Sequence, residues 1–494
     1  MDNTIRNEDS IFAIKTTKGQ PNYEFTHDFI LPDMYGDLKK ILYYTASVGT
    51  AGGYPEKDKI SDKITYDGTV FVKIMFCDES GELGNLTYDL PYSFEVRLPE
   101  CEGVLRYADK VELCSLGVKA VNPRKINVRA SLSPRLCVFD EIETRLSGKK
   151  VPKNVEKLMQ SVNTMEICSF IERDISISED VVIDKSMPVI DRLAFINVTP
   201  QVSDARCDGA RIYIKGYTDV EMIYISAAEP YYYCKRIMFE KSIEAKGLDM
   251  GATLFAYIRV CKTGACVTED ETGEARTVEI DFIAEAGAVC VMNVENCYVS
   301  DAYAVGQNST LTRRELRFAE LERPKTFTQN RRVMLSTADA PVAFFTRTKC
   351  AEADGTTQIT VDIYAIMKNA ENGYSVQTLS DSMFVDFPFD SDAYFGYFDI
   401  SVSDKSIRPE NGSVYLCYNV SGRSIVYKND SVNCVCDIET GERETKGGAG
   451  LILYYPEENE SDWDIAKKFK VAYNDFVSAN ANTQNQSAVL ITKK

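Results

Sequence analysis

The sequence predicts a mainly β protein, made of tandem β-sandwich-like modules and closed by a small α+β domain of the order β-α-α-β. Three observations predict this. Residues that suit strands are frequent, with 28 Tyr and 23 Phe in 494 residues. Several strand-like phrases return at an offset of about 152 residues. After residue 450 the pattern changes from alternation to helical spacing.

The repeats begin with Asp28-Phe29-Ile30-Leu31-Pro32, which returns as Asp180-Val181-Val182-Ile183-Asp184. A strand-like phrase at 68–76 corresponds to 216–224, and a second one at 125–130 corresponds to 276–281. Polar and apolar residues alternate along these phrases, as in sheets with one buried face. We therefore expect two successive β-rich modules, at 1–150 and 151–306.

A third, weaker copy is expected at 307–438, with central strands at Ile359–Tyr364 and Ser413–Tyr418. Its opening segment matches the other copies poorly. Between modules, Val155–Val162 resembles a short helix and 306–325 a polar connector. The polar, glycine-bearing stretch 439–449 is predicted to be a flexible linker.

Residues 450–494 form a separate pattern. Leu451–Tyr455 is predicted to be a strand, and Ser461 with Asp464 has the spacing of a helix capping box. The helix after Ser461 has an apolar stripe of Trp463, Ile465, Ala466 and Phe469. A second short helix at Tyr473–Asn480 and a closing strand at Ala488–Thr492 complete the unit.

This unit resembles a LysM domain, on the segment Trp463–Phe469 and on Val471, Phe476, Ala479 and Asn480. LysM domains bind N-acetylglucosamine polymers through the loop before the first helix and the loop before the last strand. At these places the sequence has Asn459-Glu460-Ser461-Asp462 and Gln484-Asn485-Gln486 in place of the family's usual turns. The resemblance with altered loops implies docking to protein. The candidate partner- or glycan-binding residues are Asn459, Glu460, Ser461, Asp462, Trp463, Asn482, Thr483 and Gln484.

The repeats resemble SPOCS modules, on Ile30-Leu31-Pro32-Asp33, the phrase 68–76, and 273–281 with Val299–Tyr303. With the LysM-like unit, the order is similar to that of clostridial spore coat assembly proteins of the SipL type. This resemblance implies a non-enzymatic structural adaptor of sporulation, made in the mother-cell cytoplasm and placed at the forespore surface and in the spore coat. Its implied partners are a filament-forming scaffold ATPase and other coat proteins. The rival hypothesis is a protein of the cortex or cell wall that binds peptidoglycan or a chitin-like glycan.

Charge excludes several classes of partner. The formal net charge is −18, and no Lys/Arg cluster interleaved with aromatics interrupts it. Such a surface repels phosphate backbones and anionic lipid, so we expect no nucleic acid and no membrane partner. Neither an N-terminal apolar segment nor an apolar run of roughly 18–20 residues is seen, so no signal peptide or transmembrane segment is expected.

Catalytic patterns are also absent from the sequence. The one histidine, His27, aligns with Glu179 of the second copy, so a catalytic role there is not expected. Without a second histidine, Ser-His and Cys-His arrangements have no base. No phosphate-binding or dinucleotide-binding glycine motif occurs, and we expect no enzyme, cofactor or metal. Acidic runs such as 269–271 and 457–460 fit solvated turns, with weak calcium binding as the alternative.

Three further features have two interpretations each. The 15 cysteines include no CxxC pair, which favours reduced thiols, although late cross-linking stays open. Tyr231-Tyr232-Tyr233 fits a strand with packed rings or an exposed contact patch. Trp463, the one tryptophan, fits the core of the small unit or a partner contact.

Overall fold

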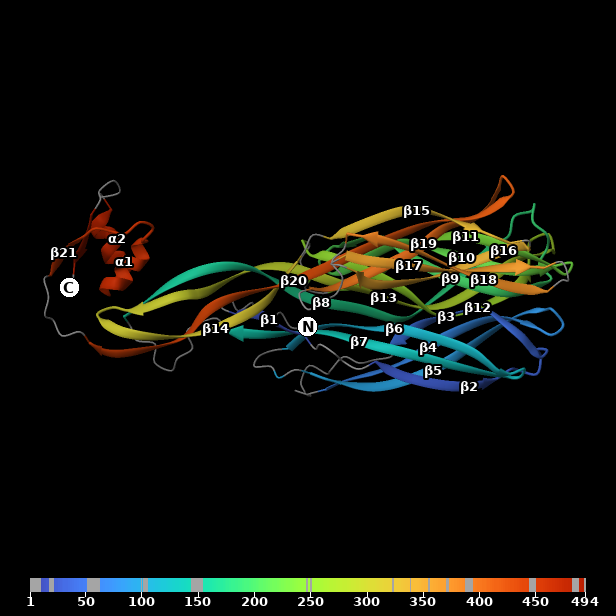
Figure 1. Ribbon diagram of the computed structural model, residues 1–494, viewed down its shortest axis with the longest axis horizontal. Helices are drawn as coiled ribbons and strands as arrows, with labels where there is room; N and C mark the ends of the chain where they lie inside the picture. Colours follow the sequence, from blue (N-terminus) through green and yellow to red (C-terminus); the bar gives the residue numbers. More distant parts are fainter. Residues whose placement is uncertain are drawn as a thin grey trace.

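The computed structural model describes the chain from residue 10 to 492, with several gaps. The described ranges are 10–16, 22–50, 63–98, 100, 105–143, 154–245, 248, 251–321, 324–337, 339–353, 356–369, 373–386, 394–443, 450–481 and 488–492. Antiparallel strands fill most of these residues, and the two short helices of the described part lie near the C-terminus. The predicted fold class, mainly β with a small α+β end, is confirmed (Figure 1).

The first module is built from two layers. One layer is the sheet of β3 (Leu38–Thr50), β4 (Lys63–Asp78) and β5 (Leu83–Arg97), with β4 in the middle. In the other layer, β7 (Lys125–Glu143) lies between β2 (Tyr23–Ile30) and β6 (Leu105–Asn122). Alternate residues of both central strands are buried in one cluster, which includes Val70, Val72, Ile74, Ile126 and Val128. The alternation in the sequence thus marks the inner faces of a sandwich.

The same strand order occurs twice more. In the second module β10 (Arg211–Ser226) is the middle strand of one sheet and β13 (Ala275–Ala304) of the other. In the third module these places are taken by β17 (Thr356–Lys368) and β20 (Ser413–Arg443), which contain the two phrases expected as central strands. The other strands of these two modules are β8 (Val155–Val182), β9 (Arg192–Cys207), β11 (Glu229–Glu244), β12 (Thr253–Glu269), β15 (Lys325–Leu335), β16 (Ala340–Ala353), β18 (Tyr374–Val385) and β19 (Tyr394–Glu410), and β1 (Ser10–Thr16) pairs with both β7 and the later strand 307–321.

Three strands, from β8, β13 and β20, continue beyond the sandwiches and form a stalk together with a fourth strand. Residues 292–304 of β13 pair with 155–166 of β8, and β14 (Gln307–Leu321) pairs with 427–443 of β20. Two small apolar clusters hold the paired strands together; their buried members are Tyr298, Leu316, Phe318 and Cys434 in one, and Val299, Ala302, Val435 and Ile438 in the other. In Figure 1 the stalk runs from the sandwiches to the C-terminal unit.

The stalk corrects three expectations. Val155–Val162 is the start of β8 and not a helix, and the polar segment 307–321 is strand β14. Residues 439–443, expected in a linker, continue β20 as far as the pair of Arg443 with Gln307. The remainder of that predicted linker, 444–449, lies outside the described residues. These segments are polar because each strand of the narrow stalk has one face toward solvent, so their composition resembles that of a connector.

The three modules meet at an aromatic centre made of equivalent residues. Tyr43 of β3, Phe195 of β9 and Phe345 of β16 are all buried. Their ring centroids are 4.8 Å apart for Tyr43 and Phe345, 5.1 Å for Phe195 and Phe345, and 5.8 Å for Tyr43 and Phe195. Around them pack Met75, Ile223 and Ile366, one from each middle strand. The body is therefore one packed assembly of three sandwiches.

Polar contacts surround this centre at the module boundaries. The Lys405 ammonium lies 2.9 Å from a Glu221 carboxylate oxygen, and both side chains are buried, with 9% and 3% exposed. Tyr232 donates a hydrogen bond of 2.8 Å to the same carboxylate. Tyr231 and Tyr233 pack against the core of the second module, so the tyrosine run is packed and does not form an exposed patch. At another boundary the Arg192 guanidinium donates to the Leu83 carbonyl over 2.6 Å.

Shortening one ring of the aromatic centre should weaken the whole body. We expect Phe345→Ala to lower the free energy of unfolding by about 3–5 kcal/mol, because it leaves a cavity where three modules meet. Chemical denaturation followed by circular dichroism measures this. Phe384→Ala is the matched control, because Phe384 is 62% exposed on β18; it should change the value by only about 0.5 kcal/mol. Equal effects of both variants would contradict a central role for the three rings.

Candidate functional site

The C-terminal unit consists of two strands and two helices in the predicted order. β21 (Leu451–Tyr454) pairs with β22 (Val489–Thr492), and α1 (Asp462–Phe469) and α2 (Tyr473–Asn480) lie between them in sequence. Their apolar residues form one small core, whose buried members include Trp463, Ile465, Ala466, Val471, Phe476 and Ile491. The expected helical stripe is therefore the inner face of α1.

The start of α1 is fixed by the predicted capping box. The Asp464 amide donates to the Ser461 hydroxyl oxygen over 3.2 Å, and the Ser461 amide donates to the Asp464 carboxylate over 3.1 Å. Both bonds satisfy amides that the first helical turn leaves unpaired. Asp464 thus takes the place that Glu usually has in this motif.

The loop before α1 is organised by Glu460. Its carboxylate accepts hydrogen bonds from the Tyr454 hydroxyl at 2.8 Å and the Glu457 amide at 3.1 Å, and pairs with the Lys468 ammonium at 3.2 Å. The bonds from Tyr454 and Glu457 hold the pKa of Glu460 below its usual value. Among the predicted binding residues of this loop, Glu460 is thus occupied within the unit, whereas Asn459, Ser461 and Asp462 are exposed.

Trp463 lies in the contact between this unit and the tip of the stalk. Its indole N–H donates to the Asp301 carboxylate over 2.9 Å, and its ring packs against Tyr303 of β13 at 5.0 Å between centroids. The side chain is only 7% exposed. Of the two interpretations of Trp463, packing inside the protein is the one observed.

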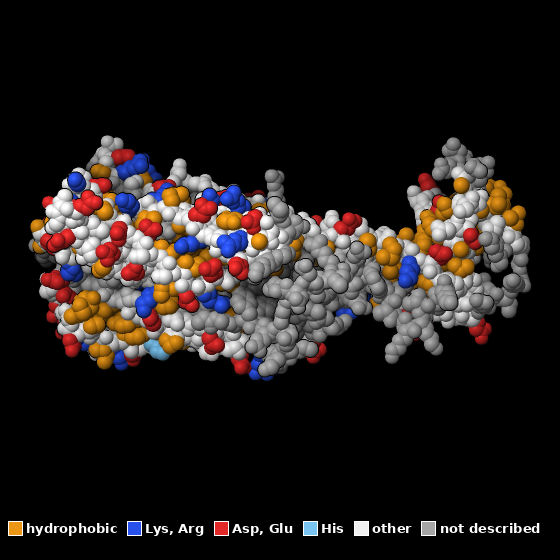
Figure 2. Space-filling view, turned by 180° about the vertical axis from the view of Figure 1, so that it is seen from behind, with side chains coloured by type: hydrophobic (Ala, Val, Ile, Leu, Met, Phe, Trp, Pro, Cys, Tyr) orange, Lys and Arg blue, Asp and Glu red, His pale blue; other side chains and the backbone are white. Residues whose placement is uncertain are grey.

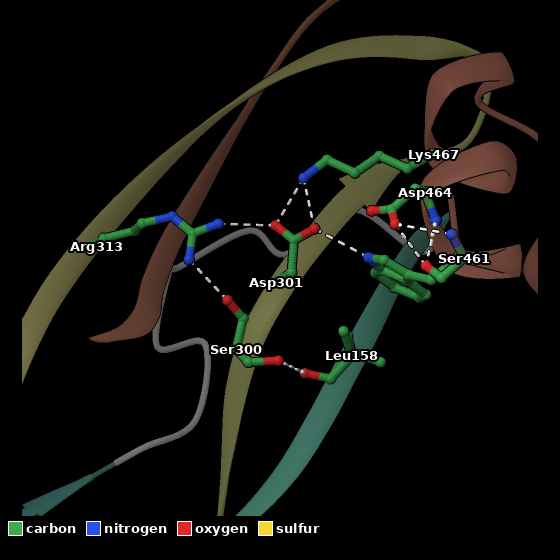
Figure 3. Close-up of polar contacts among 8 residues, drawn as sticks. Leu158, Ser300, Asp301, Arg313, Ser461, Asp464 and Lys467 are labelled. Atoms are coloured by element: carbon green, nitrogen blue, oxygen red, sulfur yellow. Dashed lines mark hydrogen bonds and ion pairs between the residues drawn. The ribbon is translucent and has the colours of Figure 1, made fainter. Parts of the chain in front are cut away.

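Asp301 is the centre of this contact, as Figure 3 shows. Besides Trp463 it accepts from Lys467 of α1 at 2.7 Å and from Arg313 of β14 at 2.9 Å. Burial by itself raises the pKa of Asp301, but the hydrogen bonds from Lys467 and Trp463 outweigh it, so the pKa lies below its usual value. The carboxylate is therefore charged at neutral pH and joins both strands of the stalk tip to α1.

Backbone contacts add to this attachment. The Tyr303 hydroxyl donates to the Val471 carbonyl over 2.7 Å, and the Gly306 amide donates to the Lys470 carbonyl over 2.9 Å. The Lys470 ammonium also donates to Asn308 of β14 over 2.5 Å. The turn between α1 and α2 thus rests on the turn between β13 and β14, and the unit is docked on the stalk as well as joined to it by the chain.

The outer face of the small sheet remains open to solvent. Leu451, Leu453 and Tyr455 have exposed fractions of 61%, 60% and 63%. Glu457 and Glu458, both exposed, follow directly in the chain. We call Leu451, Leu453 and Tyr455 the outer strip. Figure 2 shows hydrophobic side chains gathered on this unit at the end of the molecule, and such clusters on a small domain are typical of contact surfaces.

A cavity of about 500 Å³ lies between the second and third modules. Its lining includes Tyr231, Phe344, Lys368 and Lys405. Both ammonium groups already have carboxylate partners, since Lys368 pairs with Glu229 at 2.5 Å and Lys405 with Glu221. The cavity therefore has no free charge among these groups with which to hold an ionic ligand.

The other predicted features are placed as follows. Asn482, Thr483 and Gln484 lie outside the described residues. No group of three His, Cys, Asp or Glu side chains suited to a metal ion occurs in the described part of the chain. Within the same residues, no helix has the length and apolar character needed to cross a membrane.

Comparison with known proteins gives no match. No model of a known protein family, no curated protein and no solved structure matches this chain. The features that bear on function are the outer strip and the attachment of the C-terminal unit, together with the resemblances in the sequence.

Removing the Asp301 carboxylate should loosen the C-terminal unit from the stalk. We expect Asp301→Ala to lose about 1.5–3 kcal/mol of docking free energy, as is usual for hydrogen bonds to a charged group. Because Trp463 is the one tryptophan, its emission should shift to longer wavelength and acrylamide should quench it faster. Asp204→Asn, at an exposed position of β9, is the control and should leave both readings unchanged. Unchanged quenching in the Asp301 variant would contradict the docking contact.

The same contact should be lost at low pH. Because the pKa of Asp301 is lowered in the folded protein, its contribution is complete above the ordinary Asp value of about 3.9. It is lost as the pH falls through the lowered pKa, where the carboxylate takes up a proton. We expect Trp463 emission to stay constant from pH 7 to about pH 4 and to shift below that range. Asp301→Ala should lack this acid-dependent step, and an identical step in both proteins would exclude Asp301 as its origin.

Proposed function

We propose that this protein is a non-enzymatic structural adaptor of spore coat assembly, whose C-terminal unit docks on a partner protein through the outer strip. The observation that carries the proposal is the exposure of Leu451, Leu453 and Tyr455 together at the far end of a long stalk. The three sandwiches at the other end offer separate surfaces for further coat proteins. The protein thus has two regions for binding, held apart by the stalk.

The outer strip has the composition of a contact surface. Burying a Leu side chain stabilises a complex by about 1.5–3 kcal/mol, and Tyr is enriched at the centre of interfaces. The neighbouring carboxylates of Glu457 and Glu458 favour a partner with Lys or Arg beside its own apolar residues. A protein surface provides this combination.

The resemblances supply the identity of the proposed partner. The unit resembles a LysM domain, and the repeats resemble SPOCS modules of spore coat assembly proteins. We therefore take the scaffold ATPase on the forespore surface as the partner of the outer strip, and the mother-cell cytoplasm as the place of action. Sugar binding has less support, because Trp463 is buried against the stalk and Glu460 is engaged within its own loop.

A charge in the outer strip should weaken docking without unfolding the unit. We expect Leu453→Glu to weaken binding to the scaffold ATPase at least about tenfold, because it removes apolar contact and places a carboxylate against the partner's apolar residues, where it loses its hydration. Binding is measured by calorimetry with the purified partner. Val477→Glu is the matched control on α2, where Val477 is 38% exposed; it should bind as the wild type does. Trp463 emission checks the fold of both variants.

The outcomes separate the two candidate partners. If Leu453→Glu binds the ATPase with wild-type affinity, the outer strip is not the docking surface. If the wild type instead binds N-acetylglucosamine oligomers saturably and ignores the ATPase, the glycan-binding hypothesis replaces the adaptor.

A further inference from the structure

Two cysteines lie directly opposite each other where the second sandwich continues into the stalk. Cys290 of β13 pairs in register with Cys168 of β8, and on its other side Cys290 faces Leu254, near the start of β12. Among the described strand pairings, this is the one place where two cysteines are paired. Cα atoms of opposed residues on antiparallel strands are about 4.5–5.5 Å apart, which lies within the roughly 4.4–6.8 Å that a disulfide spans.

Both side chains point toward the same core. The Cys168 sulfur lies 3.9 Å from the Cys290 carbonyl oxygen, and both residues belong to the apolar cluster of the second sandwich. Neither cysteine is part of a disulfide; Cys290 is buried and Cys168 is half-buried. Contact with the Cys168 thiol and burial raise the pKa of the Cys290 thiol. Cys290 is therefore protected from reagents in solution, and Cys168 is the thiol that they reach first.

We propose that Cys168 and Cys290 form an intramolecular disulfide when the folded protein meets a low-molecular-weight disulfide. The Cys168 thiolate attacks one sulfur of the reagent, forms a mixed disulfide and releases the other half as a thiol. The Cys290 thiolate then attacks the Cys168 sulfur, which closes the protein disulfide and releases the second half as a thiol. The two hydrogens lost by the protein end on the two released thiols, so the reagent is reduced as the cysteine pair is oxidised.

The position of the bond gives it a structural consequence. β8 and β13 form the half of the stalk that carries Asp301. Cys290 lies one residue before Val291, the last residue of β13 that pairs with β12. Beyond Val291, β13 keeps β8 as its paired neighbour in the described strands. A covalent link at Cys168 and Cys290 joins the two strands just before this point. Oxidation would thus fasten the base of the stalk without changing the outer strip, and the inference does not rest on the proposed function.

The experiment uses the folded full-length chain and cystamine as the small disulfide. After incubation, remaining thiols are alkylated in denaturant and the protein is digested with trypsin. Cys168 falls in peptide 158–173 and Cys290 in peptide 277–313, which also contains Cys297. The Cys297→Ser background therefore makes the assignment unique. We expect a linked pair of these two peptides by mass spectrometry.

Three variants test the assignment. Cys168→Ser should abolish the linked pair, because peptide 158–173 then contains no thiol. Cys350→Ser, at an exposed cysteine, should leave it unchanged. Cys290→Ala should stop the reaction at the mixed disulfide, so that cysteamine accumulates on Cys168. Circular dichroism checks that each variant is folded.

Two results would overturn the proposal. One is full alkylation of Cys168 and Cys290 in folded protein that has been incubated with cystamine. The other is a link from Cys168 to Cys207, which packs against the same cluster from strand β9.

Discussion

The packing of Tyr43, Phe195 and Phe345 against one another determines how the rest of the molecule is arranged. The three rings come from β3, β9 and β16, and each of these strands is the first in chain order of a three-stranded sheet in its own sandwich. Their contact therefore fixes the three sandwiches in one relative position. Aromatic pairs at these distances add about 0.5–1.5 kcal/mol each beyond the area they bury. The buried pair Lys405–Glu221 then constrains which faces meet, because a shifted boundary would leave either charge without its partner in an apolar setting. With the body fixed, β8, β13 and β20 can extend past it in register and form the stalk.

Much of the fold followed from the sequence, because the relevant signals are local. Alternation along 68–76 and 216–224 marked the middle strands β4 and β10, and Ser461 with Asp464 marked the start of α1. The stalk could not be predicted in this way. Its strands are half-exposed and polar, and their pairing joins segments such as 155–166 and 292–304 that are far apart in the chain. Such non-local pairing leaves no periodic mark that distinguishes a strand from a connector.

The binding residues that the resemblance implies in the loop before α1 stay a prediction. One of them, Trp463, faces the stalk in the structure. Asp301 was missed altogether, since its partners Trp463 and Lys467 are more than 160 residues away in the chain. The outer strip did leave a signal. In Leu451-Ile452-Leu453-Tyr454-Tyr455 every residue is apolar or aromatic, and a two-stranded sheet covered by helices on one face must expose alternate members of such a run.

The attachment at Asp301 changes how an adaptor of this kind would work. A flexible tether lets two binding regions meet partners in any orientation, and its benefit depends on the length of the linker. Here α1 rests on the tip of the stalk through Trp463, Lys467 and Lys470, so the direction of the outer strip is set by the body. Partners bound at the two ends would then be held at a defined distance and angle. The two binding regions lose their orientational freedom when the protein folds, so binding of the second partner does not lose that entropy again. For an ordered protein layer, this favours one geometry of assembly over the many that a tether would allow.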